Sequence, residues 1–330
     1  MAPGEKAPER YFYHSFPRRG RETEGEIEKG CQILTLIRDF GLVMAPETVK
    51  WEYEHADGAP PRESVVLQQR VCFTELEPRE LSLHAKKFGR FALEFDIPTL
   101  KSLGAVPVFY IPRALAKAEG AEGTASTLVM TLIDATVLLT RIEKVLGELQ
   151  KVDQKEGIVQ CSFGFQETRN KQFDLDAGEI RRVLEAFTHA LTPPELMLPA
   201  LEGLLKFFYP ADDDRRDEVL GYYREREWRI AGSLAIRGKD LMARPSTELI
   251  DRLKALDTDF FGRELPPNSG TSLAEGVFVL PGLGDRRILQ MARRIIVPEA
   301  GLAQAKAIFT GQSEMPPIIS IEALEGEGRG

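Results

Sequence analysis

One charged segment constrains the fold of this chain more than any other feature. Residues 222–230 read Tyr-Tyr-Arg-Glu-Arg-Glu-Trp-Arg-Ile. With the two-residue period of a β-strand, Glu225, Glu227 and Arg229 share one face, and Trp228 lies on the other and is expected to pack in the core. Two carboxylates beside a guanidinium suit a cationic ligand or a division of acid and base roles. The alternative is a solvated edge strand whose alternating charges prevent pairing with other strands.

Size and charge narrow the class of protein. A length of 330 residues favours two domains, or one domain with an insertion. The net charge of −8, without a long basic run, argues against general nucleic-acid binding. Residues 1–10 lack the apolar stretch of a signal peptide, and the longest apolar run, 128–139, is too short to span a bilayer. Three widely spaced cysteines fit a reducing compartment, so we expect a cytoplasmic protein with no membrane partner.

Periodicity and turn residues predict both strands and helices. Strands are expected at 11–16, 69–74, 91–96, 106–111, 159–165 and 294–297. Helices are expected at 24–40, 78–88, 97–103, 127–150, 177–191, 194–208, 246–256 and 299–309. The order lacks regular βαβ alternation, which indicates the α+β class.

The same pattern predicts the domain organisation. Flexible tails are expected at 1–10 and 323–330. The α+β core would be formed by residues 11–122 and 207–322, and a mainly helical insertion would occupy 123–206. Its long helix is predicted to be amphipathic, with most of its apolar side chains, Leu128 and Leu138 among them, broadly on one side.

The sequence offers little sign of a metal site or of the commonest hydrolase motifs. The triplet Asp212-Asp213-Asp214 is more typical of a solvated loop than of a metal site. Gly-x-x-x-x-Gly-Lys, Gly-x-Ser-x-Gly and His-Glu-x-x-His are absent from the sequence, which argues against P-loop NTPases, α/β-hydrolases and zincins. We therefore expect no metal cofactor.

Three segments stand out together: Val71-Cys72-Phe73-Thr74-Glu75-Leu76 followed by 84–88, residues 88–96 leading into 104–111, and Tyr223-Arg224-Glu225-Arg226-Glu227-Trp228-Arg229 with Ile295-Ile296-Val297-Pro298 downstream. In this order and rough spacing they resemble the AbiGi family of bacterial abortive-infection proteins. The resemblance covers about residues 11–112 and 207–310. It implies a component of a toxin–antitoxin system for antiviral defence, whose partner would be a cognate toxin or antitoxin, or a phage-derived protein.

His14-Ser15 on the first predicted strand, Thr74 on the second and Glu225-x-Glu227 late in the chain form an arrangement similar to that of mono-ADP-ribosyltransferases. These enzymes carry an Arg or His on a first strand, a Ser/Thr-bearing strand in the middle and a Glu-x-Glu strand late in the chain. Here His14-Ser15, Thr74 and Glu225-x-Glu227 occupy those places. The resemblance implies an ADP-ribosyltransferase-like mixed sheet with NAD as substrate. Glu227 would stabilise the cation that forms as nicotinamide leaves, Glu225 would orient the acceptor, and His14 would bind NAD.

Other side chains complete the expected NAD site, each with an alternative role. Ser15, Thr74, Tyr110 and Arg229 are the further candidates for binding NAD, and either Tyr110 or Tyr13 would stack on nicotinamide. Arg229 would grip a phosphate or instead pair with Glu94 or Asp96 across the sheet. A histidine in an aromatic strand, as at position 14, is also typical of a buried, hydrogen-bonded core residue. His84, on a predicted helix, is assigned no role.

Two hypotheses of different classes follow. An NAD-consuming enzyme requires His14, Thr74 and Glu227 to converge in one pocket, and we expect the carboxyl pKa there to be raised. A non-catalytic antitoxin or sensor would instead use the helical insertion as its partner surface. A pocket beneath Glu227 would favour the enzyme, and an accessible apolar stripe on residues 127–150 would favour the binding protein.

Overall fold

A computed structural model shows the fold, and the description is limited to part of the chain. The described residues are 9–17, 25–53, 62–112, 124–153, 157–163, 171–190, 194–211, 226–232, 235–236, 239–265, 267, 269–312 and 314–327. The chain divides into two compact units. The first contains residues 1–50, 65–113 and 206–330, and the second contains 51–64 and 114–205. The second unit thus takes in the predicted insertion up to residue 205, together with 51–64 and 114–122.

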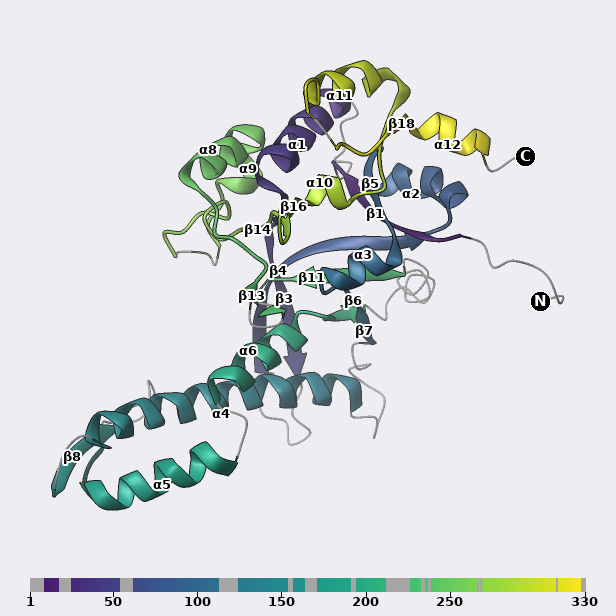
Figure 1. Cartoon of the computed structure of the whole chain (residues 1–330). Helices are drawn as coiled ribbons and strands as arrows, with labels where there is room; N and C mark the ends of the chain where they lie inside the picture. The colour runs from purple at the N-terminus through teal and green to yellow at the C-terminus, as the bar shows by residue number, and fades with distance from the viewer. Residues whose placement is uncertain are drawn as a thin grey trace. The chain divides into compact units, whose positions relative to one another are not determined.

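An eight-stranded, mostly antiparallel sheet organises the first unit (Figure 1). In spatial order its strands are β18 (Ile318–Ser320), β17 (Arg294–Val297), β5 (Phe91–Phe95), β1 (Tyr11–Phe16), β4 (Arg62–Leu76), β11 (Glu227–Ala231) and β6 (Val106–Pro107), with β3 (Pro46–Tyr53) also pairing with β4. Only β17 and β18 run parallel among the registered pairs of this sheet in the described residues. The α+β prediction is confirmed.

Helices cover both faces of this sheet, because successive apolar side chains of its strands point to opposite faces and both faces are buried. On β1, Phe12 packs into the main core with α1 (Glu26–Phe40), α3 (Ile97–Ser102), α10 (Ile288–Met291) and α11 (Leu302–Ile308). Its neighbour Tyr13 packs into a second core with α2 (Leu81–Phe88) and α12 (Ile321–Glu327). Gly30 allows α1 to approach the sheet closely, since a Cβ there would lie 2.3 Å from the Phe91 ring.

A third core joins α1 to the helices that follow β11. Leu36 of α1 packs with apolar side chains of α8 (Thr247–Leu256) and α9 (Thr258–Phe261). The Ser246 hydroxyl caps α8 by accepting from the Leu249 amide at 3.2 Å, as the sequence predicts for this helix start. Short elements complete the unit: β2 (Leu42–Met44), β7 (Phe109–Pro112), β10 (Phe208–Ala211), β12 (Ala235–Ile236), β13 (Lys239–Asp240), β14 (Phe278–Leu280), β15 (Gly282–Leu283), β16 (Arg286–Arg287), η1 (Pro78–Glu80) and η2 (Glu299–Gly301).

The charged segment forms an interior strand. β11 lies between β4 and β6, so the edge-strand alternative is wrong. The strand begins at Glu227, because Arg226 has a left-handed φ of 45° that breaks the extended backbone. Residues 222–225 lie outside the described part of the chain. The Trp228 ring meets Phe12 edge-on at 5.1 Å, which confirms the expected core packing.

The predicted C-terminal tail is wrong over part of its length. Residues 323–327 continue helix α12, and Leu324 is buried in the second core. The Ser320 hydroxyl accepts from the Ala323 amide at 3.1 Å and so caps the helix start. Residues 1–8 and 328–330 lie outside the described part.

The second unit has a smaller core. Its elements are α4 (Thr124–Asp153), β8 (Ile158–Phe163), β9 (Lys171–Asp176), α5 (Ala177–Ala190) and α6 (Pro194–Leu205), with α4 contacting both α5 and α6 (Figure 1). Val129, Met130 and Ile133 of α4 are buried, but Leu128 and Leu138 are exposed, so the prediction of one apolar side is wrong at these two positions. No helix in the described ranges is long and apolar enough to cross a membrane.

Candidate active site

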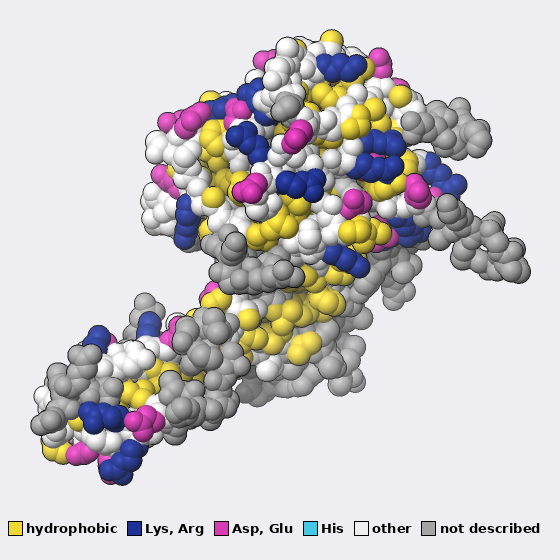
Figure 2. Space-filling view, viewed as in Figure 1, with side chains coloured by type: hydrophobic (Ala, Val, Ile, Leu, Met, Phe, Trp, Pro, Cys, Tyr) yellow, Lys and Arg dark blue, Asp and Glu magenta, His cyan; other side chains and the backbone are white. Residues whose placement is uncertain are grey.

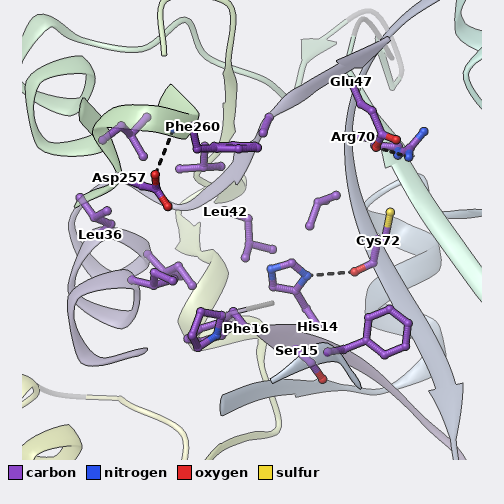
Figure 3. Close-up of a pocket in the computed structure, with 18 of the residues that line it drawn as sticks. His14, Ser15, Phe16, Leu36, Leu42, Glu47, Arg70, Cys72, Asp257 and Phe260 are labelled. Carbon is purple, nitrogen blue, oxygen red and sulfur yellow. Dashed lines mark hydrogen bonds and ion pairs between the residues drawn. The ribbon is translucent and has the colours of Figure 1, made fainter. Parts of the chain in front are cut away.

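The candidate site is a cavity of about 780 Å³ in the first unit, where β1 and β4 separate (Figure 3). The two strands stay paired up to Tyr13 and Thr74. Beyond that pair the imidazole of His14 enters the gap, and its Nδ1 donates to the carbonyl oxygen of Cys72 at 2.9 Å. Because a carbonyl oxygen only accepts, this bond places a proton on Nδ1 in either charge state of the ring. The separation of the two strands creates the space that the cavity occupies.

Glu227, the first residue of β11, lines this cavity with an ionised carboxylate. Its Oε1 accepts from Arg229 Nε at 2.8 Å, and its Oε2 accepts from Arg229 Nη2 at 3.3 Å and from the Tyr110 hydroxyl. Burial alone would raise the pKa of this carboxyl. The charge and hydrogen bonds of Arg229, helped by hydrogen bonds from Cys72 and Tyr110, overcome burial and lower the pKa to about 2. The expectation of a raised carboxyl pKa is therefore wrong.

Arg229 is the structural partner of Glu227. Its side chain is 2% exposed, and its guanidinium carbon lies 5.0 Å from the centroid of the Tyr209 ring. Side chains two residues apart on a strand point the same way, which brings Arg229 against Glu227. The sequence alternative of a pair with Glu94 or Asp96 is wrong for this reason. A buried, two-point contact of this kind fixes the orientation of the carboxylate.

A chain of polar side chains continues from Glu227 across the sheet. Thr74 of β4 stands opposite Glu227 in the strand register. His84 of α2 lies with Nε2 3.0 Å from Thr74 Oγ1 and with Nδ1 3.4 Å from Ser15 Oγ. Burial lowers the pKa of His84 to about 4, with a smaller contribution from the charge of Lys87, so the ring is neutral at pH 7. A neutral imidazole donates from one nitrogen and accepts at the other, so the two hydroxyls take opposite roles.

His84 is the site residue that the sequence reasoning missed. A signal for it was present: Leu81, His84 and Phe88 recur at three- and four-residue intervals, which places them on one face of a helix. Leu81 is buried, and the His84 and Phe88 rings stack at 4.3 Å. Both His84 and Phe88 line the cavity.

The register places His14 and Glu227 on opposite faces of the sheet. Thr74 pairs with both Glu227 and Tyr13, so these three side chains share one face. His14 follows Tyr13 and points to the other face, where its ring lies 5.6 Å from that of Phe73. His14 and Glu227 line the same cavity because the strands between them have separated. A ligand would meet them from two sides.

The cavity extends beyond His14 into an apolar part. Figure 3 shows Asp257 and Phe260 on one side of His14 and Arg70 and Cys72 on the other. Lys29 pairs with Asp257 at 2.8 Å. The apolar walls of this part come from α1, β2 and α8, through Ile33, Leu36, Ile37, Leu42, Leu253 and Leu256.

The predicted site residues fall into three groups. Five of them line the cavity: Tyr13, His14, Ser15, Thr74 and Glu227. Tyr110 and Arg229 are buried and contact Glu227, so Tyr110 orients the carboxylate rather than presenting its ring for stacking. Tyr13 is also buried, and its hydroxyl donates to Glu94 at 2.9 Å. Glu225 lies outside the described residues, so its predicted role stays a prediction.

No protein-family model, curated protein or solved structure matches this chain. Within the described ranges, no group of three or more His, Cys, Asp and Glu side chains is placed to hold a metal ion. The triplet Asp212-Asp213-Asp214 lies outside those ranges. Function must therefore be argued from the chemistry of the cavity and from the sequence resemblances.

Proposed function

We propose that this chain is an NAD-consuming enzyme of the ADP-ribosyltransferase type that acts in bacterial antiviral defence. The carrying observation is that the ionised Glu227 carboxylate lines the same cavity as Thr74 and His14. The three residues come from β11, β4 and β1, which are neighbours in the sheet. The order of histidine, hydroxyl and late glutamate along the chain, which the transferase resemblance implies, supports the proposal. An ADP-ribosyltransferase-like sheet is part of the same proposal.

The chemistry asked of Glu227 is to stabilise positive charge. When the bond between nicotinamide and ribose breaks, nicotinamide leaves with the electron pair and the ribose carbon becomes cationic. A carboxylate with a pKa of about 2 stays negative near neutral pH and favours that state. Arg229 and Tyr110 already hold the carboxylate in place, so little reorganisation accompanies the reaction. An acceptor hydroxyl then bonds to the ribose carbon and releases its proton to solvent.

The neighbouring groups suit the binding of a ribose. The Thr74 hydroxyl stands beside Glu227 and is oriented by neutral His84. Hydroxyls of this kind exchange hydrogen bonds with the hydroxyls of a sugar. His14 faces the ligand from the opposite wall, with its Nδ1 proton committed to the Cys72 carbonyl. We therefore assign Glu227 to catalysis, Thr74 and His14 to binding, and His84 to the positioning of Thr74.

The direct test is release of nicotinamide from NAD by the purified chain, alone and with cell extract as a source of acceptor. Glu227→Gln removes the charge and keeps the shape, and we expect it to lower the rate at least about 100-fold. The matched control is Glu75→Gln, the same change on β4, at a residue outside the cavity lining that pairs with Arg10 at the surface. Failure of the wild-type chain to release nicotinamide under either condition, with folding intact, would refute the enzyme proposal.

A second candidate function, a non-catalytic antitoxin or sensor, is favoured by the second unit. Apolar side chains lie between charged ones on its visible surface (Figure 2). Six large apolar residues of this unit are at least 39% exposed: Leu128, Val137, Leu138, Ile158, Val183 and Leu204. At about 100° per residue, the three on α4 point in different directions, so they form no single stripe within the described residues. A partner would have to contact several faces of this unit.

The antitoxin candidate is tested by co-expression with the product of the neighbouring gene. The double variant Val137→Ser/Leu138→Ser removes two exposed apolar side chains of α4 and should release such a partner. Leu83→Ser, at an exposed leucine of the first unit, is the matched control. A complex that survives the double variant would argue against α4 as its docking surface.

A further inference from the structure

The apolar part of the cavity contains an exposed aromatic ring that packs against a buried one. Phe260 of α9 lines the cavity and is 39% exposed. Its ring meets that of Phe261 edge-on at 4.9 Å, and Phe261 is itself buried in the core shared by α1 and α8. An aromatic side chain held in this way offers a flat surface on which a planar ring can stack.

A cation stands next to this ring. The guanidinium carbon of Arg263 lies 4.7 Å from the centroid of Phe260. The other two cations of the cavity lining are engaged by carboxylates, Lys29 by Asp257 and Arg70 by Glu47. The side chain of Arg263 makes no ion pair within the described part of the chain. It is therefore placed to meet an anionic group of a ligand whose ring lies near Phe260.

An ionised carboxylate borders the same space. Asp257 Oδ1 accepts from the Phe260 amide at 3.0 Å, and Oδ2 accepts from Lys29 Nζ at 2.8 Å. The Lys29 hydrogen bond lowers the pKa of Asp257, against an opposing effect of burial. A carboxylate has about four acceptor positions, so Asp257 retains capacity for a further donor. An exocyclic amino group is a donor of that kind, whereas a ring carbonyl in its place would be repelled.

We propose that this part of the cavity, lined by Phe260, Arg263 and Asp257, is the subsite for the adenine ring and adjacent phosphate of an adenine nucleotide. The ring stacks on Phe260, its amino group donates to Asp257, and Arg263 binds the phosphate. An acyl chain fits less well, because Asp257, Lys29 and the exposed Arg263 place charged groups among the apolar walls of this part of the cavity.

The adenine subsite rests on the proposed function in one respect only, which is that the whole ligand would be NAD. His14 stands between Phe260 and the β4 side of the cavity (Figure 3). A dinucleotide could therefore place adenine at Phe260 and its other ribose at Glu227, on opposite sides of His14. The cavity volume of about 780 Å³ lies within the range typical of small-molecule sites.

The test is binding of AMP to the full chain, measured by titration calorimetry. Phe260→Ala removes the stacking surface and should weaken AMP binding at least about tenfold. The matched control is Phe109→Ala, a comparably exposed phenylalanine of the first unit that does not line the cavity, and it should leave the affinity unchanged. Arg263→Met should also weaken AMP binding and should leave binding of adenosine, which has no phosphate, near the wild-type value. All three side chains are solvent-exposed, so the variants should retain the wild-type melting temperature.

The outcomes separate this inference from the proposed function. Inosine monophosphate carries a carbonyl where AMP has the amino group, so it should bind more weakly than AMP. No AMP binding to the wild-type chain at millimolar concentration, equal binding of the two nucleotides, or an unchanged affinity in Phe260→Ala would each overturn the adenine subsite. AMP binding without nicotinamide release from NAD would support the subsite and remove the enzyme proposal.

Discussion

On one face of β4 and β11, Phe73 and Trp228 pack into the main core; on the other face, Glu227 and Arg229 form a buried ion pair beside the cavity. The two faces alternate along the same strands, yet they stabilise the fold differently. Each aromatic side chain contributes by the apolar area that it buries, largely independent of pH. The charged side chains stabilise only as a set, because removal of one leaves the other buried without its partner.

The sharpest test of this difference is Arg229→Met, which keeps apolar bulk and removes the charge. The Glu227 carboxylate would then be buried without its counter-charge, and we expect the free energy of unfolding to fall by about 3–5 kcal/mol. Urea unfolding measures the loss. Arg252→Met, at a partly exposed arginine paired with Asp39, is the control and should cost less than about 1 kcal/mol. Equal losses in the two variants would show that burial of the ion pair does not matter.

The second prediction concerns the loss of folding stability at low pH. The pKa of Glu227 is about 2 in the folded chain, against an ordinary value of 4.5 in the unfolded chain, so the unfolded state binds the proton more readily. The stabilisation by this carboxylate is fully present above pH 4.5 and is lost as the pH falls from 4.5 towards 2. The difference amounts to roughly 3 kcal/mol. The wild-type chain should therefore lose that much more stability than Glu227→Gln over this range, measured by urea unfolding at each pH. Parallel pH curves for the two proteins would contradict the lowered pKa.

The aromatic face predicts a smaller and pH-independent change. Phe73→Leu leaves an apolar side chain in the core and removes the edge-on contact with Phe95 at 5.7 Å. We expect a loss of about 1–2 kcal/mol in the free energy of unfolding. Thermal and urea unfolding should give the same loss at pH 7 and at pH 4.5. A loss that varied with pH would mean that Phe73 is coupled to an ionisable group, either His14 beside it or the charges on the other face.

Much of the fold follows from local sequence signals. Strands β1, β5 and β17 and helices α1 and α3 lie within about two residues of their predicted bounds, because glycine, proline and capping residues mark their ends. Helix α12 is only seven residues long, too short to show a helical period in the sequence, and its Ile321 and Leu324 pack in the second core with α2. Short strands such as β18 depend on a partner distant in the sequence and leave no local pattern.

The site was predictable only in part for the same reason. The shared face of Glu227 and Arg229 follows from the strand period, and Thr74 and His14 were proposed from a resemblance rather than from spacing. The direction of the Glu227 pKa shift depends on whether Arg229 contacts this carboxylate, and the sequence does not determine that contact because it depends on the tertiary structure. Placing His84 required knowing which face of α2 meets the sheet.

The smallest change predicted at pH 7 is at His84, which belongs to the charged face through Thr74. His84→Gln retains a hydrogen-bonding side chain, so at pH 7 the cost should be about 1 kcal/mol or less. The pKa of His84 is about 4 in the folded chain, against an ordinary value of 6.5 in the unfolded chain, so the unfolded state takes up the proton first as the pH falls. The contribution of the neutral ring is present above pH 6.5 and is lost between pH 6.5 and 4. The wild-type chain should lose stability across that window, and His84→Gln should lose less. Phe73→Leu, used as control, should show the same dependence of the free energy of unfolding on pH as the wild-type chain. An NMR titration of His84 centred near pH 6.5 would contradict the burial of this histidine against the charged face.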